Sequence, residues 1–331
     1  MQNAFTIRHI SSKGKISFGF FLASGSKNAV HAALFGNLGI AITKFIAAFF
    51  TGSAAMWAES YHSASDTFNQ VLLLIGIKRS AKAPTERHQF GYGKEMFFWS
   101  FIVATMLFGI SGVLSIENGL TSLVSTHKIE NANISYVVLA ISFAFEANAL
   151  WIAYKLFKQT IEARGEKVSL RTLFIEFQES KDPSIITVMV EDSAALLGIA
   201  IAVIGIFLSE TTGNMIFDAT SSLAIGVILM AFAFFLAREN RGLLVGESIS
   251  KREYAKIMSL IKSIQEVKSV VSMRTMHLGT DDVIIGIEVN LADRLDTGRI
   301  ETVIDTIEQK IRQVIPYVKD HHVFVEVQTQ Q

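Results

Sequence analysis

Long apolar runs separated by short polar segments dominate the first 240 residues of the chain. Six of these runs reach about 20 residues, the length that a helix needs to cross the hydrocarbon core of a bilayer. The runs cover approximately residues 29–50, 53–77, 95–117, 134–157, 184–208 and 216–238. This pattern predicts a six-helix transmembrane bundle.

The pattern changes after residue 238 to shorter, charged elements typical of a water-soluble domain. Helical or alternating apolar spacing predicts, in order, a helix at 251–264, strands at 270–276 and 283–291, a helix at 299–314 and a strand at 323–327. The order α-β-β-α-β predicts a small α/β domain with its helices on one face of the sheet. We therefore expect three parts: a basic tail at 1–27, the bundle at 28–240 and the α/β domain at 241–331.

Basic residues indicate the orientation, because Lys and Arg concentrate on the cytoplasmic side of a membrane protein. The loop after the second run and the segment between the fourth and fifth runs are both basic, whereas the loops at the opposite end contain only Lys128. Residues 1–58 contain no Asp or Glu. We expect both termini in the cytoplasm and the protein in the cell membrane. An organelle presequence is the alternative interpretation of the acid-free N-terminal segment.

Composition supports a membrane protein and limits the side chains that could bind a metal. Of the 331 residues, 50% are hydrophobic and only 18% are charged, and the mean hydropathy is +0.39. The net charge of zero gives no indication of nucleic-acid binding. The chain has no cysteine, which excludes disulfides, thiolate metal sites and cysteine nucleophiles. Any bound metal must be held by histidines and carboxylates.

The second run carries Glu59, His62 and Asp66, whose spacing places them on one face of a helix. An ionisable group within a membrane span is a functional hypothesis by default. His62 and Asp66, four residues apart, can reach one ion, and imidazole with carboxylate is a common ligand set for zinc. The alternative is a buried His–Asp hydrogen bond that fixes helix packing.

The fifth run contains adjacent carboxylates, Glu191 and Asp192, in otherwise apolar surroundings. Burying two adjacent charges is costly, and a cation shared with the second helix would remove that cost. We therefore predict a metal site made by His62, Asp66, Asp192 and Glu191. The alternative is a protonated acid that is hydrogen-bonded to Ser193 or Thr187.

Other polar residues have two interpretations. Asn37, Lys44 and Glu146 could line a path together with Glu59, or they could form contacts between helices, with Lys44 extending to the membrane surface. Asp218 begins the sixth run and could favour a helix N-terminus. In the C-terminal domain, three histidines could hold a regulatory metal or lie in solvated turns; they are His277, His321 and His322.

These residues resemble the cation diffusion facilitator family. The segment 51–66 is similar to its second-helix signature, with His62 and Asp66 at the ligand positions, and 90–95 and 115–119 resemble the family's next loop and third helix. Asn37 and Lys44 resemble its first-helix polar residues. The resemblance implies six helices, a cytoplasmic α/β domain, a homodimer, metal/proton antiport and a tetrahedral site between helices two and five.

The fifth helix departs from the common family pattern. The family places a His four residues before the Asp, whereas Val188 occupies that position here. The Glu191–Asp192 pair instead resembles the branch that contains the mitochondrial zinc exporter. Glu191 lies about 100° round the helix from Asp192, so either Glu191 or a water completes the predicted site.

The sequence thus predicts a zinc/proton antiporter that exports metal from the cytoplasm by alternating access. Its substrate is Zn²⁺, with Mn²⁺, Fe²⁺, Co²⁺ or Ni²⁺ as alternatives; its partners are a second copy, the bilayer and protons. The alternative function is a non-transporting metal sensor or dimeric scaffold acting through the C-terminal domain. No recognisable catalytic set supports an enzyme.

Overall fold

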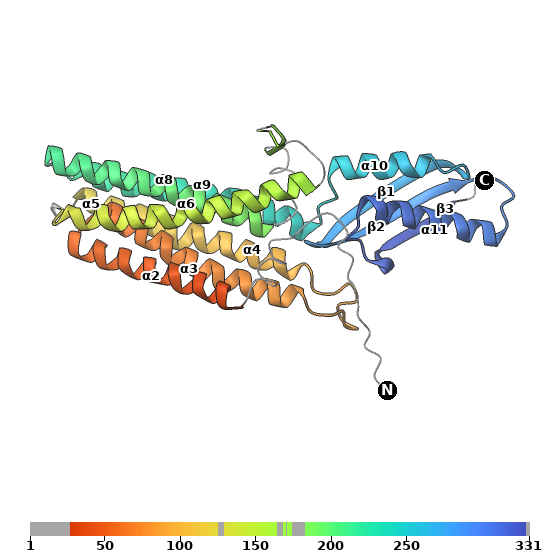
Figure 1. Cartoon of the computed structure of the whole chain (residues 1–331), viewed down its shortest axis with the longest axis horizontal. Coiled ribbons are helices and arrows are strands. Elements are labelled where there is room, and N and C mark those ends of the chain that lie inside the picture. Colours follow the sequence, from red (N-terminus) through yellow and green to blue (C-terminus); the bar gives the residue numbers. More distant parts are fainter. Residues whose placement is uncertain (1–26, 125–128, 164–167, 170, 174–182, 329–331) are drawn as a thin grey trace.

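The structure, a computed structural model, describes residues 27–124, 129–163, 168–169, 171–173 and 183–328. These residues form a long helical bundle joined end to end to a small α/β domain (Figure 1). The bundle consists of α2 (Lys27–Thr51), α3 (Ala54–Ser80), α4 (Glu95–Met106), the π-helix η1 (Leu107–Val113), α5 (Leu114–Val124), α6 (Ala132–Ala163), α8 (Pro183–Thr212) and α9 (Ile216–Val245). Because α4, η1 and α5 follow one another without a break, the described residues form six helical passes, as predicted.

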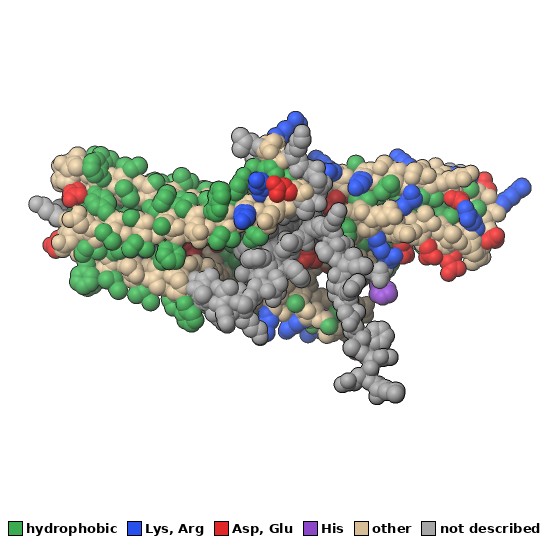
Figure 2. Space-filling model, viewed as in Figure 1, with side chains coloured by type: hydrophobic (Ala, Val, Ile, Leu, Met, Phe, Trp, Pro, Cys, Tyr) green, Lys and Arg blue, Asp and Glu red, His purple; other side chains and the backbone are tan. Residues whose placement is uncertain are grey.

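The surface of the bundle suits a membrane. Five described helices are long and apolar enough to cross one: α2, the continuous 95–124 helix, α6, α8 and α9. The sixth pass, α3, is long enough but carries a polar stripe, the row of Glu59, His62, Asp66 and Asn69 along one face of the helix. Large apolar side chains face outward, among them Phe49, Trp151 and Phe234, which are 74%, 64% and 68% exposed. Hydrophobic side chains are spread over the bundle, whereas charged side chains gather on the C-terminal domain (Figure 2).

Helix ends differ from the predicted ones at several places. The predicted sixth span stops at residue 238, but α9 continues to Val245 through Arg238, Glu239 and Arg241. Charged residues end an apolar run without ending a helix, because a helix that leaves the bilayer keeps its backbone hydrogen bonds.

Between α2 and α3 the chain turns at Gly52, whose φ of +66° is a conformation that favours glycine.

Close approach of small residues holds α9 against the 95–124 helix. A Cβ atom added to Gly226 would lie 2.9 Å from the carbonyl oxygen of Gly112 and 3.0 Å from the backbone nitrogen of Ile116. Packing of this kind is a main source of helix association in lipid, where no hydrophobic effect drives helices together.

Asp218 on α9 caps the N-terminus of α3, a neighbouring helix rather than its own. Its carboxylate accepts hydrogen bonds from the Ser53 hydroxyl at 2.6 Å and from the backbone N–H groups of Ala54 at 2.5 Å and Ala55 at 3.3 Å. The first N–H groups of a helix have no partner within that helix, so this carboxylate satisfies them and favours the positive end of the helix dipole. Asp218 does lie at a helix N-terminus, as predicted, but the helix is α3 rather than its own.

We expect Asp218→Ala to lower the free energy of unfolding in detergent micelles by about 2–4 kcal/mol, because it leaves buried N–H groups without an acceptor. Circular dichroism during chemical denaturation measures this change. Glu117→Ala removes an exposed carboxylate from the helix α5 and serves as the control. An equal effect of the two substitutions would contradict the capping role.

The C-terminal domain contains α10 (Lys251–Lys262), β1 (Val267–Gly279), β2 (Asp282–Leu291), α11 (Thr297–Val314), the 3₁₀ turn η2 (Asp320–His322) and β3 (Val323–Gln328). The α-β-β-α-β order is as predicted; β2 and β3 are each one residue longer than predicted, whereas β1 extends three residues further at each end. In the sheet order β1-β2-β3, β1 pairs antiparallel and β3 parallel to β2. Both helices pack their apolar sides on one face of the sheet, where Ile257, Ile307, Ile285 and Ile287 are buried.

The loop between α3 and α4 lies directly against the C-terminal domain. A Cβ atom added to Gly93 would lie only 2.3 Å from the carbonyl oxygen of Leu278, at the end of β1. The rings of Phe90 and His322 meet edge to face, with centroids 5.4 Å apart. This basic loop and the C-terminal domain therefore lie at the same end of the bundle, as the charge pattern requires (Figure 1).

Candidate metal site

The polar stripe of α3 faces the interior of the bundle. Glu59, His62 and Asn69 are at most 1% exposed, whereas Phe68 and Val71 on the opposite side are 54% and 38% exposed. This division agrees with the predicted placement of Glu59, His62 and Asp66 on one face of a helix. It also places the ionisable groups away from lipid, where their cost would be highest.

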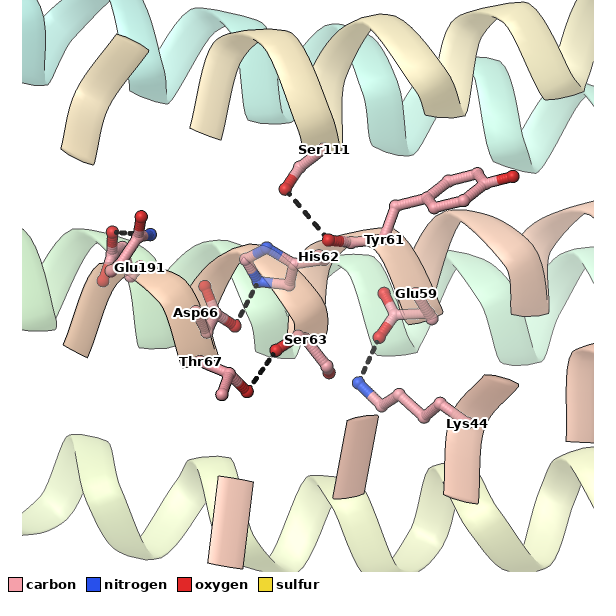
Figure 3. Close-up of polar contacts among 10 residues, drawn as sticks. Lys44, Glu59, Tyr61, His62, Ser63, Asp66, Thr67, Ser111 and Glu191 are labelled. Carbon is pink, nitrogen blue, oxygen red and sulfur yellow. Dashed lines mark hydrogen bonds and ion pairs between the residues drawn. The ribbon is translucent and has the colours of Figure 1, made fainter. Parts of the chain in front are cut away.

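His62 and Asp66 lie side by side on this stripe (Figure 3). The His62 Nε2 atom is 3.5 Å from Asp66 Oδ2, which is long for a hydrogen bond. Neither ring nitrogen of His62 has a hydrogen-bond partner among the described residues, and neither has Asp66 Oδ1. Buried polar atoms are nearly always satisfied, so this pair has unused capacity to bind a ligand.

The adjacent carboxylates of α8 lie near the same stripe. Asn69 Nδ2 donates a hydrogen bond of 2.7 Å to Glu191 Oε1 and links α3 to α8. Asp66 is close enough to interact electrostatically with both Glu191 and Asp192. Asp192 Oδ2 is buried without a hydrogen-bond partner among the described residues. The two helices thus bring acids from separate apolar spans into one region.

The predicted alternative for the α8 acids is not what the structure contains. The Ser193 hydroxyl donates to the backbone carbonyl of Met189 at 2.6 Å, one turn earlier in the same helix, and Thr187 Oγ1 has no partner in the described part of the chain. The observed partner of Glu191 is Asn69, which lies on the polar stripe of α3.

The site is not closed around an ion in this conformation. Among residues 27–124, 129–163, 168–169, 171–173 and 183–328, no three His, Asp or Glu side chains converge closely enough to hold one metal ion. Val188, one turn before Asp192, supplies no donor atom at the place where the common family pattern has a histidine. Binding one ion with the predicted residues therefore requires α3 and α8 to bring their side chains closer together.

Lys44 and Glu59 form a buried ion pair between α2 and α3. The Lys44 Nζ atom lies 2.8 Å from Glu59 Oε2, and both side chains are fully buried (Figure 3). Gly198 on α8 makes room for this pair, because a Cβ atom there would lie 2.4 Å from Glu59 Oε1. The alternative in which Lys44 extends to the membrane surface is wrong, since its partner holds it inside. The spacing of residues along the chain does not indicate this pairing.

The remaining predicted path residues share a small pocket. It is lined by Asn37 and Ile40 of α2, Ser63 and Asp66 of α3, and Glu146 of α6. Asn37 and Glu146 therefore border the same region as Asp66, although they come from two other helices.

The histidines of the C-terminal domain have separate surroundings. His322 is buried, and its Nδ1 atom lies 2.7 Å from Asp282 Oδ1, while Lys319 contacts the other oxygen of Asp282. His277 is buried with Nδ1 3.4 Å from the Gly279 carbonyl oxygen, and His321 is exposed. In the described part of this domain, too, no three His, Asp or Glu side chains gather into a metal site.

The apolar outer surface, the buried ionisable groups and the appended α/β domain define an integral, multi-pass membrane protein with a polar interior site. Two family models cover nearly all the described residues: the cation efflux transmembrane domain matches residues 30–245, and the cation efflux protein cytoplasmic domain matches residues 249–328. The chain therefore belongs to the cation efflux family, also called the cation diffusion facilitator family. This assignment confirms the family prediction, and the family is one of transporters rather than enzymes.

Several known proteins are similar to this chain. It is 32% identical over 254 residues to the mitochondrial proton-coupled zinc antiporter SLC30A9 of Mus musculus, an alignment covering 77% of this chain and 44% of that protein. It is 31% identical over 254 residues to metal tolerance protein C4 of Arabidopsis thaliana, covering 77% and 54%. It is 25% identical over 297 residues to magnetosome protein MamB of Magnetospira sp. (strain QH-2), covering 88% and 92%. The chain spans about half the length of the first two relatives.

Proposed function

We propose that this protein is a zinc/proton antiporter that exports zinc from the cytoplasm by alternating access. The observation that carries the proposal is the burial of unpartnered ligand atoms on two facing helices, namely His62 and Asp66 on α3 and Asp192 on α8. The names of the mouse and human relatives, which state proton-coupled zinc antiport, support it. So does the Glu191–Asp192 pair, which we assign to the branch resembling the mitochondrial zinc exporter.

The ligand types favour zinc among the divalent metals. An imidazole nitrogen with carboxylate oxygens suits zinc, cobalt, nickel or iron better than calcium or magnesium. Val188 replaces the second histidine of the common pattern, so oxygen ligands make up more of the site. Such hard ligands also bind manganese. Glu191 or a water supplies the fourth ligand; Glu191 Oε1 accepts the hydrogen bond from Asn69, which leaves Oε2 for the metal.

Proton coupling follows from the ligands themselves. Histidine and carboxylate bind metal only when deprotonated, so a metal ion entering the site displaces protons. In the proposed cycle a cytoplasmic ion draws α3 and α8 together and releases protons from His62, Asp66 and Asp192. The helices then rock, the site opens to the other side, and protons replace the metal.

Assembly and orientation complete the proposal. We assign the C-terminal domain to a homodimer interface, consistent with its match to the cytoplasmic domain of cation efflux proteins. The basic loops and both termini face the cytoplasm, and the membrane is the cell membrane.

Transport by the purified chain tests the proposal. Reconstituted into liposomes, it should move zinc against its gradient when an opposing proton gradient is imposed, as followed by a zinc-sensitive dye. Collapsing the proton gradient with an ionophore should stop this accumulation. Zinc binding to the C-terminal domain without any flux above that of protein-free liposomes would instead support the alternative function, a non-transporting sensor or scaffold.

A further inference from the structure

A small pocket between α2, α3 and α6 adjoins the proposed transport site. Its polar lining is Asn37, Ser63, Asp66 and Glu146, with Ile40 as the apolar member. Asp66 belongs both to this pocket and to the His62–Asp66 pair. The two regions therefore meet at one carboxylate.

Every polar group that lines this pocket offers oxygen. Asn37 has an amide carbonyl, Ser63 a hydroxyl, and Asp66 and Glu146 have carboxylates. Oxygen donors of this kind suit hard divalent cations such as Mn²⁺ and Mg²⁺, whereas the imidazole of His62 beside Asp66 suits zinc. The pocket and the His62–Asp66 pair thus differ in the metal ions that they prefer.

Two polar atoms that line this pocket lack hydrogen-bond partners. Ser63 is only 4% exposed, and its hydroxyl has no hydrogen-bond partner among the described residues. Leaving such a group unpaired lowers stability. Asp66 Oδ1 is unpartnered as well. A buried hydroxyl and a buried carboxylate oxygen that both lack partners indicate a ligand that accepts their lone pairs.

The charge of the pocket also calls for a cation. Lys44 contacts Glu59 at 2.8 Å, and its ammonium also interacts electrostatically with Glu146 and Asp66, so one ammonium serves three carboxylates. The described residues provide no ion pair to Glu146, and none to Asp66 apart from His62. Asp66 and Glu146 interact electrostatically with each other, and two facing carboxylates repel when both are charged. A dication between them removes both the repulsion and the desolvation cost.

We propose that Asn37, Ser63, Asp66 and Glu146 form a second, all-oxygen divalent-cation site that shares Asp66 with the transport site. The proposal rests on the transport function proposed above. An ion held in this pocket passes to His62 and Asp192 without ever leaving Asp66, so the entering ion exchanges its ligands stepwise. Glu146, on α6, thereby supplies an acidic ligand from a helix outside the α3–α8 pair.

Counting bound Mn²⁺ tests this site without relying on transport. Electron paramagnetic resonance of free Mn²⁺, titrated with the purified full chain in nanodiscs, gives the number of ions bound per protomer. We expect two classes of site in the unmodified chain. Glu146→Gln should weaken one class by roughly tenfold or more, Asp192→Asn should weaken the other, and Asp66→Asn should weaken both.

Glu162→Gln is the matched control, because Glu162 is an exposed carboxylate on the same helix as Glu146; it should leave both classes unchanged. Retention of both classes in Glu146→Gln would overturn the second site. So would loss of one and the same class in Glu146→Gln and Asp192→Asn, since that result means a single merged site.

Zinc flux separates this inference from the function on which it rests. If Glu146→Gln keeps normal flux and normal Mn²⁺ binding while Asp192→Asn loses flux, the transport proposal stands and the second site is rejected. If the unmodified chain carries no flux, the transport function is rejected whatever the Mn²⁺ count.

Discussion

Zinc flux driven by a proton gradient is expected to fall by about a hundredfold or more in Asp66→Asn and in Asp192→Asn. The amide has nearly the shape of the carboxylate but carries no negative charge, so each variant removes an anionic ligand without creating a cavity. Both residues belong to the α3–α8 region, where their ligand atoms are buried without partners. Initial rates of zinc uptake into proteoliposomes, with equal amounts of reconstituted protein, give the comparison.

The control for this experiment is Glu210→Gln, which neutralises an exposed carboxylate near the end of α8. It should transport at the rate of the unmodified chain. Helical circular dichroism and thermal stability should be unchanged in all three variants. Unimpaired flux in either aspartate variant, with the fold retained, would remove that residue from the transport site.

Lys44→Met is expected to lower the free energy of unfolding by about 3–5 kcal/mol, because it leaves the carboxylate of Glu59 buried without its counter-charge. The pair lies 2.8 Å apart with both side chains at 0% exposure, so water cannot compensate. The double variant Lys44→Met/Glu59→Leu removes both charges and should recover most of the loss. Chemical denaturation in detergent micelles, followed by circular dichroism, measures both variants.

An exposed ion pair provides the matched control for this prediction. Lys158 and Glu162 on α6 lie 3.5 Å apart, with side chains 42% and 51% exposed. Lys158→Met should change the free energy of unfolding by no more than about 1 kcal/mol. The interpretation of Lys44 would fail if the two lysine variants lost similar stability, or if the double variant were as unstable as Lys44→Met.

The elements of this fold were predictable because their periods are visible in the chain. Apolar runs gave the six passes, and alternating spacing gave the strands of the C-terminal domain. Helix ends were less predictable, since Arg238, Glu239 and Arg241 end the apolar run but not α9. The π-helix at Leu107–Val113 had no signal in the residue pattern.

The candidate site was predictable in its members but not in their contacts. The spacing of His62 and Asp66 placed them on one face, and adjacent acids in an apolar run marked Glu191 and Asp192. The pairing of Lys44 with Glu59 depends on how α2 packs against α3, which one-dimensional spacing does not contain. The same is true of Asp218, which caps a helix more than 160 residues earlier in the chain. The Gly52–Ser53 turn before α3 was the available signal for a helix start there.

The absence of a side chain at Gly93 has a mechanical consequence. Because the backbone of the α3–α4 loop touches the end of β1, with no space between Gly93 and the Leu278 carbonyl group, these segments cannot shift independently. A tilt of α3 or α4 pushes or pulls the sheet of the C-terminal domain at that point. We therefore expect a rearrangement of α3 or α4 to be communicated through this contact to the water-exposed domain.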